Sequence, residues 1–104
     1  MQQIFIPTCN GIKVVLPENI IRVEASSNYC KVFFDNKNTL TVAKVLGWFE
    51  DKLPEAVFCR IHRAHLVNRM FISEISNDSK ILLMNGEQLQ VSRRKRVAFR
   101  QLIN

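Results

Sequence analysis

Four basic residues in a row stand near the end of the chain. Ser92 precedes Arg93, Arg94, Lys95 and Arg96, and a stretch with helical spacing follows them. Serine is a preferred N-cap, so we expect these side chains in the first turn of a helix, where cations oppose the macrodipole. A bound anion would relieve that conflict, because helix amides, a hydroxyl and guanidinium groups all suit phosphate. The alternative is a solvated charge run on a surface helix.

Both histidines of the chain fall within a second segment, residues 58–68. Cys59, His62 and His65 are spaced three apart, which suggests a metal site. The chain has no second cluster of Cys and His to complete such a site, and in a strand Cys59 and His62 would face opposite ways. We therefore expect no metal, a hydrogen-bonded His62 at the end of a strand, and an exposed Arg63 at the corner that follows.

A third segment, residues 24–31, is a polar link between two apolar runs. It combines small hydroxyls with an amide, an aromatic ring and an ammonium group, those of Asn28, Tyr29 and Lys31. Such a set suits hydrogen bonding to phosphates and to base edges. The alternative is a polar β-turn with Tyr29 packed back on the sheet.

Enzyme signatures are missing from the sequence. The chain has three glycines, so no P-loop is available, and no Ser, Cys or Asp stands in a nucleophile motif. His62 and His65 have no nearby carboxylate pattern for acid–base work. We predict that the chain is not an enzyme and needs no cofactor.

The composition favours a polyanionic partner. Fifteen Lys and Arg against nine Asp and Glu give a net charge of +6, and the pI is near 9.7. The excess is uneven: residues 1–52 carry six basic and five acidic side chains, a net +1, whereas residues 53–104 carry nine and four, a net +5. Three widely spaced cysteines, no signal peptide and no apolar stretch long enough for a membrane helix lead us to expect a cytoplasmic protein with free thiols.

Short runs rich in β-branched and aromatic residues predict a mainly β chain. The expected strands cover residues 12–16, 20–24, 30–35, 39–42, 57–62, 71–76, 80–84 and 88–92, with turns at residues 35–38, 77–79 and Asn85-Gly86. Helical spacing predicts one helix over residues 42–53, capped by Thr41 and stopped by Pro54, and a second after Ser92. We see no repeat or linker and expect residues 1–104 to form one domain.

Several blocks of the sequence resemble the LytTR domain, the DNA-binding output module of bacterial response regulators. These blocks are Glu24-Ala25 with Asn28-Tyr29, Phe58-x-Arg60-x-His62-Arg63 with Leu66-Val67-Asn68, and Val91-Ser92-Arg93-Arg94. They follow the family's order and cover about the whole chain. The resemblance implies an elongated, mainly β fold of roughly ten short strands in small packed sheets, with two short helices. It also implies sequence-specific binding of double-stranded DNA in a two-component system.

In that family, side chains from three loops enter successive major grooves. The resemblance assigns this role to Asn28, Tyr29, Cys30 and Lys31 in the first loop, Arg63 at the corner, and Arg93 and Arg94 at the last segment. Two further DNA-binding candidates are Lys95, which suits phosphate, and His65, which either replaces a hydroxyl of the family or packs. Arg63 and Arg94 are the best candidates for base contacts, since a guanidinium can bond O6 and N7 of guanine together. The chain departs from the family at Ala64 and His65, where a Ser and an aromatic residue are usual, so a hydroxyl for phosphate is missing.

Members of the family commonly bind repeated half-sites, which suggests a dimer on DNA, and the usual receiver domain is not in this sequence. One alternative is an RNA-binding or nonspecific nucleic-acid module, which would display stacked aromatics. Seven of the nine aromatic residues are Phe within apolar patterns, and Tyr29 is the clearest loop aromatic, so duplex DNA is favoured. A second alternative, a protein-binding or ligand-sensing β domain, would show no salt-sensitive binding of DNA.

Overall fold

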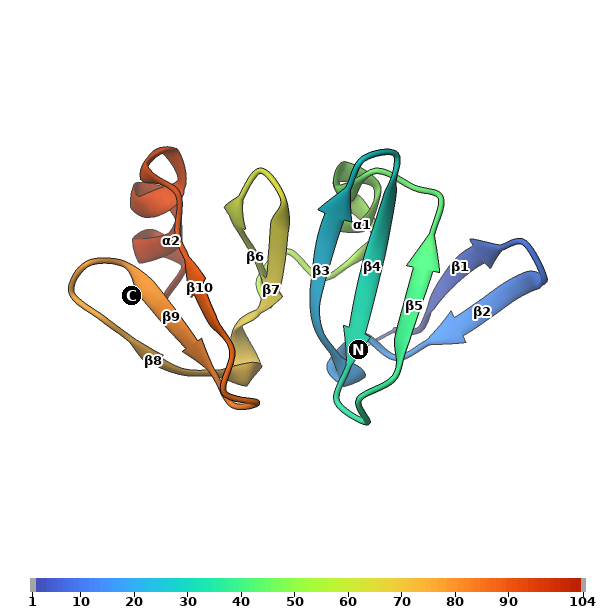
Figure 1. Ribbon diagram of the computed structural model, residues 1–104, viewed down its shortest axis with the longest axis horizontal. Helices are drawn as coiled ribbons and strands as arrows, with labels where there is room; N and C mark the ends of the chain where they lie inside the picture. Colours follow the sequence, from blue (N-terminus) through green and yellow to red (C-terminus); the bar gives the residue numbers. More distant parts are fainter. Residues whose placement is uncertain (1, 104) are drawn as a thin grey trace.

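The computed structural model describes residues 2–103, which form three antiparallel sheets arranged along one long axis (Figure 1). The molecule measures 43 × 25 × 22 Å, so the predicted elongated shape is confirmed. The described residues contain ten strands: β1 (Ile4–Thr8), β2 (Gly11–Val15), β3 (Ile20–Ser26), β4 (Tyr29–Phe34), β5 (Thr39–Val42), β6 (Phe58–His62), β7 (His65–Asn68), β8 (Ile72–Ile75), β9 (Lys80–Leu83) and β10 (Gln88–Gln90).

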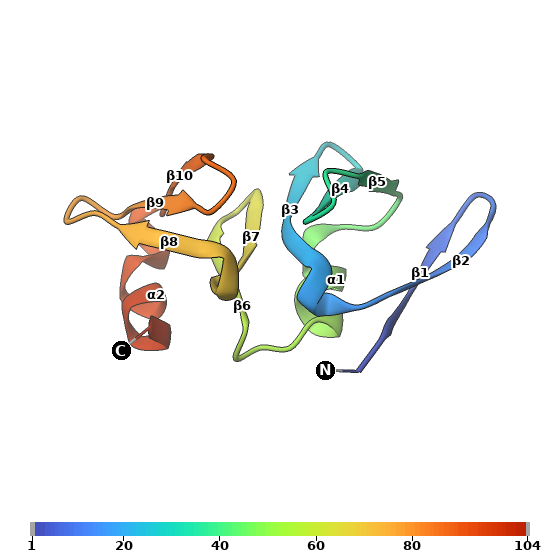
Figure 2. The same ribbon diagram turned by 90° about the horizontal axis from the view of Figure 1, so that it is seen from below.

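The central sheet has five strands in the order β5-β4-β3-β7-β6. The β1-β2 hairpin lies at one end of the molecule, and the sheet β10-β9-β8 lies at the other (Figure 1). Two helices, α1 (Leu46–Lys52) and α2 (Arg96–Ile103), pack on the same side of these sheets (Figure 2). The predicted mainly β architecture with two short helices is therefore confirmed.

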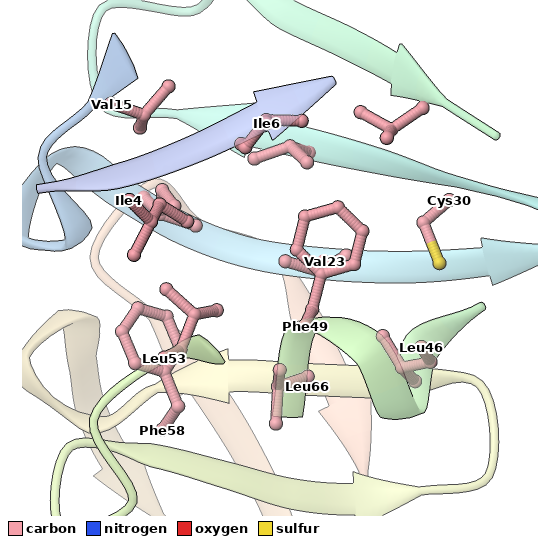
Figure 3. Packing of buried hydrophobic residues seen from close by; sticks show 13 residues of the cluster. Ile4, Ile6, Val15, Val23, Cys30, Leu46, Phe49, Leu53, Phe58 and Leu66 are labelled. Atoms are coloured by element: carbon pink, nitrogen blue, oxygen red, sulfur yellow. The ribbon is translucent and has the colours of Figure 1, made fainter. Parts of the chain in front are cut away.

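The first of two apolar cores lies between α1, the β1-β2 hairpin and one face of the central sheet (Figure 3). Alternate residues of β4 point into it, as the period of two in a strand requires, whereas a bulge after Ile20 interrupts the alternation in β3; α1 adds Leu46 and Phe49. Burial of a side chain the size of Phe49, which is 0% exposed, contributes about 2 kcal/mol.

The second core lies under α2 and the three-stranded sheet. It joins Phe99 of α2 to Cys59 and Ile61 of β6 and to Ile81 and Leu83 of β9. Because β6 and β7 contribute to this core while Phe58 and Leu66 face the first one, the central sheet ties the two halves together.

The first helix is shorter than its apolar spacing predicts. Thr41 and Val42 stay in β5, where they pair with Lys31 and Cys30, so the predicted cap at Thr41 is wrong. The helix begins only at Leu46, after an extended residue, and its last turn closes before Pro54 as expected. Sheet pairing outweighs helical spacing at this junction.

Two strands were not expected from the sequence. β1 carries a proline and β7 has only four residues, so neither gave a clear strand pattern. The predicted turns are confirmed: Gly86 takes a φ of 93°, and Lys37 and Ser79 adopt φ values of 72° and 64°. Each of these turns joins neighbouring antiparallel strands.

Candidate nucleic-acid interface

The three segments singled out in the sequence lie along one edge of the molecule. Figure 1 shows the β3-β4 turn, the β6-β7 turn and the start of the helical segment after β10 at the same upper edge. Two backbone hydrogen bonds link them: the Ala25 N–H donates to the Ala64 carbonyl at 2.9 Å, and the Ser92 N–H donates to the Ile61 carbonyl at 2.8 Å. The middle segment is thus bonded to both of its neighbours.

The middle segment, residues 61–64, is the turn that joins β6 to β7, and we call it the corner. Arg63 is exposed there, as predicted. His62 Nδ1 accepts a hydrogen bond from the Ala64 N–H at 3.0 Å, which confirms the expected bond at the strand end. An imidazole that accepts through Nδ1 carries its proton on Nε2.

Arg60 braces the corner from within β6. Its Nε donates to the His62 carbonyl at 3.0 Å, and one terminal nitrogen donates to the Arg63 carbonyl at 2.6 Å. The other terminal nitrogen pairs with Glu50 of α1 at 2.7 Å. The sequence gave Arg60 only as part of a motif; its bracing role depends on a contact with α1 that spacing along the chain does not reveal.

The first segment is a tight turn rather than a loop. Ser26 pairs with Tyr29, and Ser27, with a φ of 57°, and Asn28 form the tip. Asn28, Tyr29 and Lys31 are exposed. Cys30 is not brought to this surface, because its side chain points into the first core and is 0% exposed. Tyr29 is 48% exposed and so does not pack closely on the sheet.

The third segment, residues 92–96, is a 3-10 turn followed by the first residue of α2, and we call it the basic turn. Arg93 and Arg94 are exposed, and Lys95 is half-buried. The predicted capping by Ser92 is wrong, since its side chain makes no cap hydrogen bond; instead its backbone N–H is taken by Ile61. Among the described residues, Arg93, Arg94 and Lys95 make no side-chain hydrogen bond or ion pair.

His65 lies behind the corner. Its side chain is 21% exposed, its ring is 5.2 Å from that of His62, and its Nδ1 lies 3.8 Å from Glu24 Oε1 without a hydrogen-bond partner. Burial is the main cause that lowers the pKa of His65 below its usual value. The geometry makes His65 a support of the corner more than a surface group.

A buried arginine joins the two halves below this edge. Arg22 of β3, which is 5% exposed, bonds Glu87 in the β9-β10 turn through two nitrogens, at 3.1 and 2.7 Å, and Glu24 at 2.8 Å. The guanidinium also lies over the Phe33 ring, 3.9 Å from its centroid. These bonds lower the pKa of the Glu87 carboxyl. The sequence gave no signal for the pair of Arg22 and Glu87, which are 65 residues apart along the chain.

The metal hypothesis finds no geometry to support it. Cys59 is in the second core, and burial raises the pKa of its thiol to about 11, while His62 is at the corner. The described residues hold no group of three or more His, Cys, Asp or Glu side chains suited to a metal ion. No helix within residues 2–103 is long and apolar enough to cross a membrane.

An elongated β fold that brings polar and basic segments to one edge has the shape and charge expected of a nucleic-acid-binding module. The sequence model of the LytTr DNA-binding domain matches residues 10–104. The chain therefore belongs to the LytTr DNA-binding domain family, so it is a DNA-binding domain and not an enzyme.

Individual relatives agree with this assignment. The chain is 33% identical over 86 residues to the sensory transduction protein LytT of Enterococcus faecalis (strain ATCC 700802 / V583), a match that covers 79% of this chain and 35% of that protein. It is also similar to the solved LytTr DNA-binding domain of a Bacillus cereus protein assigned as a methyl-accepting/DNA response regulator. That structure matches with a TM-score of 0.84 and 28% identity, over 100% of this chain and 98% of the other.

Proposed function

We propose that the domain binds double-stranded DNA sequence-specifically, as the output domain of a transcriptional response regulator in the cytoplasm. The observation that carries this proposal is the alignment of three polar or basic segments along one edge, tied together by the two backbone hydrogen bonds. The 43 Å length of the molecule slightly exceeds one helical turn of B-DNA, about 34 Å. A molecule of that length can lie along successive major grooves on one face of a duplex.

The proposed contacts differ among the three segments. Arg63 and Arg94 are exposed guanidinium groups that we assign to guanine edges. Arg93, Lys95 and Lys31 supply positive charge for phosphates, and Asn28 and Tyr29 offer polar atoms at the tip of the first turn. His65 supports the corner from behind, and Cys30 is left out because its side chain is buried.

Selection of bound duplexes from a random DNA library, followed by sequencing, tests the proposal. At about physiological ionic strength we expect an enriched motif, since base contacts survive when phosphate contacts are weakened by salt. Salt-sensitive binding without enrichment would contradict base reading and point to a nonspecific or RNA-directed module. Absence of salt-sensitive binding would indicate a protein-binding or ligand-sensing domain instead.

We also propose that two copies act on repeated half-sites. The chain spans about a third of the length of the LytT protein that it matches, so regions outside the matched domain of such a protein can join copies. A repeated motif in the selected duplexes supports this arrangement. Equal affinity for one and two half-sites, with a stoichiometry of one domain per duplex, would contradict it.

A further inference from the structure

Arg60 makes contacts that single it out from the other basic residues near the proposed DNA-binding edge. Its side chain is 21% exposed and has three acceptors, the carbonyls of His62 and Arg63 and the carboxylate of Glu50. By contrast, Arg63, Arg93 and Arg94 are exposed and make no side-chain bond among the described residues. A guanidinium already engaged in this way is poorly placed to serve as a phosphate contact.

The two carbonyls held by Arg60 belong to the peptide units on either side of the Arg63 Cα. Each peptide unit is planar, so the orientation of these two planes defines φ and ψ of Arg63. Those angles in turn set the direction in which the Arg63 side chain leaves the corner. One rigid fork of donors therefore fixes the starting direction of the side chain proposed to read a base.

Further bonds hold the rest of the corner, and His62 shares one peptide unit with Arg60, because its Nδ1 accepts from the Ala64 N–H. The flanking carbonyls of Ile61 and Ala64 accept from the backbone N–H groups of Ser92 and Ala25, which anchor the two ends of the corner. Between those anchors, the Arg60 side chain donates hydrogen bonds to the carbonyls of both peptide units next to the Arg63 Cα. Glu50 of α1 offsets the charge of Arg60 and holds the guanidinium in place.

We infer that Arg60 is a positioning residue that determines base preference through Arg63. This inference rests on the proposed base-reading role of Arg63. A backbone held in the bound geometry before DNA arrives loses less conformational freedom on binding, and it limits the positions that the Arg63 guanidinium can reach. Loss of the fork should thus relax preference at the base pair that Arg63 reads, without removing a phosphate contact.

Arg60→Lys provides the test, because lysine keeps the positive charge but a single ammonium cannot reproduce the planar fork. Arg69→Lys is the matched control: Arg69 also bonds two carbonyls, those of Ala56 and Leu102, at 3.3 and 3.1 Å. Affinities are measured for the selected duplex and for duplexes with each base pair changed in turn. Thermal unfolding identifies the temperature range in which each variant stays folded.

For Arg60→Lys we expect a loss of about fivefold or more in discrimination, confined to the base pair at which Arg63→Ala also loses it. The double variant should lose no more than Arg63→Ala alone, because both changes act on the same contact. The slope of log K against log[salt] should match that of the wild type. Arg69→Lys should leave discrimination unchanged at every position.

Two outcomes would overturn the inference while leaving the proposed function intact. Unchanged discrimination in Arg60→Lys, beside a clear loss in Arg63→Ala, would show that the fork does not position Arg63. A uniform loss on all duplexes with a slope smaller by about 0.9 would make Arg60 a phosphate contact. If Arg63→Ala itself shows no base-specific loss, the proposed role of Arg63 fails instead.

If Arg60→Lys does not fold, Glu50→Gln gives a second route to the same question. It leaves both carbonyl bonds available but removes the charge that holds the guanidinium. We expect a smaller loss of discrimination at the same base pair. Full discrimination by a folded Glu50→Gln variant would count against the inference.

Discussion

The corner and the basic turn lie side by side on the proposed DNA-binding edge, yet they are built in opposite ways. At the corner, both peptide units beside Arg63 are held by Arg60, and the Ala64 N–H is held by His62. The basic turn has a backbone bond from Ser92 to the corner but no side-chain cap. The backbone at the corner is held without DNA, whereas the side chains of Arg93, Arg94 and Lys95 in the basic turn have no bonding partner among the described residues.

This difference suggests that the corner is built for a base contact, while the basic turn, apart from Arg94, supplies charge for phosphates. A base contact needs fixed geometry, because a guanidinium must meet two acceptors at once. A phosphate contact needs charge and donors, and it tolerates a range of side-chain positions. The crowding of Arg93, Arg94, Lys95 and Arg96 at a helix start is unfavourable alone and becomes favourable once phosphate docks.

The largest expected effect is a loss of DNA affinity, and it tests whether the basic turn also reads the DNA sequence. Arg94→Ala should cost roughly 1 to 3 kcal/mol on the selected duplex and relax preference at one base pair. Competition binding against duplexes changed at single positions measures this loss. An equal loss on selected and scrambled duplexes would limit Arg94 to phosphate and sharpen the contrast with the corner.

A second effect concerns stability in the absence of DNA. His62→Ala removes the acceptor of the Ala64 N–H in the half-buried corner and should lower the free energy of unfolding by about 1 kcal/mol. Ser92→Ala removes a hydroxyl that caps nothing and should change it by less than about 0.5 kcal/mol. Urea denaturation compares the two variants, and similar losses would break the contrast between the regions.

A smaller loss of DNA affinity should follow the removal of one positive charge from the basic turn. Lys95→Ala should weaken binding alike on all duplexes and lower the salt slope by about 0.9, the value for one phosphate contact. Titrations at several salt concentrations on selected and scrambled duplexes give both quantities. A loss that depends on sequence would contradict the assignment of Lys95 to phosphate.

The smallest expected effect is a pH dependence that comes from behind the corner. Because the pKa of His65 is lowered from 6.5, the unfolded chain takes up a proton more readily than the folded domain does. The stability associated with His65 is therefore present above pH 6.5 and is lost as pH falls through the lowered folded-state pKa. Urea denaturation at a series of pH values should show this decline, and His65→Gln should reduce it. An identical decline in the variant would assign the effect to other groups.

Local patterns in the sequence predicted much of this molecule and failed where distant elements meet. Asn85-Gly86 and residues 57–62 give correct turns and strands because turn chemistry and alternation are local signals. Thr41 does not cap a helix because it pairs with β4 and so stays in a strand. Cys30 is buried because β4 already begins at Tyr29, so the alternation of the strand turns the Cys30 side chain toward the core. The braces of the proposed site, Arg60 with Glu50 and Arg22 with Glu87, depend on tertiary contacts.

The exposed charges were the easier part of the site to predict. Arg63 lies at the end of a strand and the basic turn stands out by composition alone, so both could be named before the fold was known. Which of these groups is held in place could not be predicted, because that depends on β6, α1 and the basic turn approaching one another.

The central claim is that the corner reads a base through Arg63, and that the backbone sets the starting direction of this side chain before DNA binds. Arg63→Ala, titrated on selected and scrambled duplexes over a range of salt concentrations, tests it most directly. The account predicts that discrimination between the two duplexes falls by about tenfold, while the salt slope on the scrambled duplex stays at the wild-type value. Equal weakening on both duplexes, with a slope lower by about 0.9, would contradict it and make Arg63 a phosphate contact.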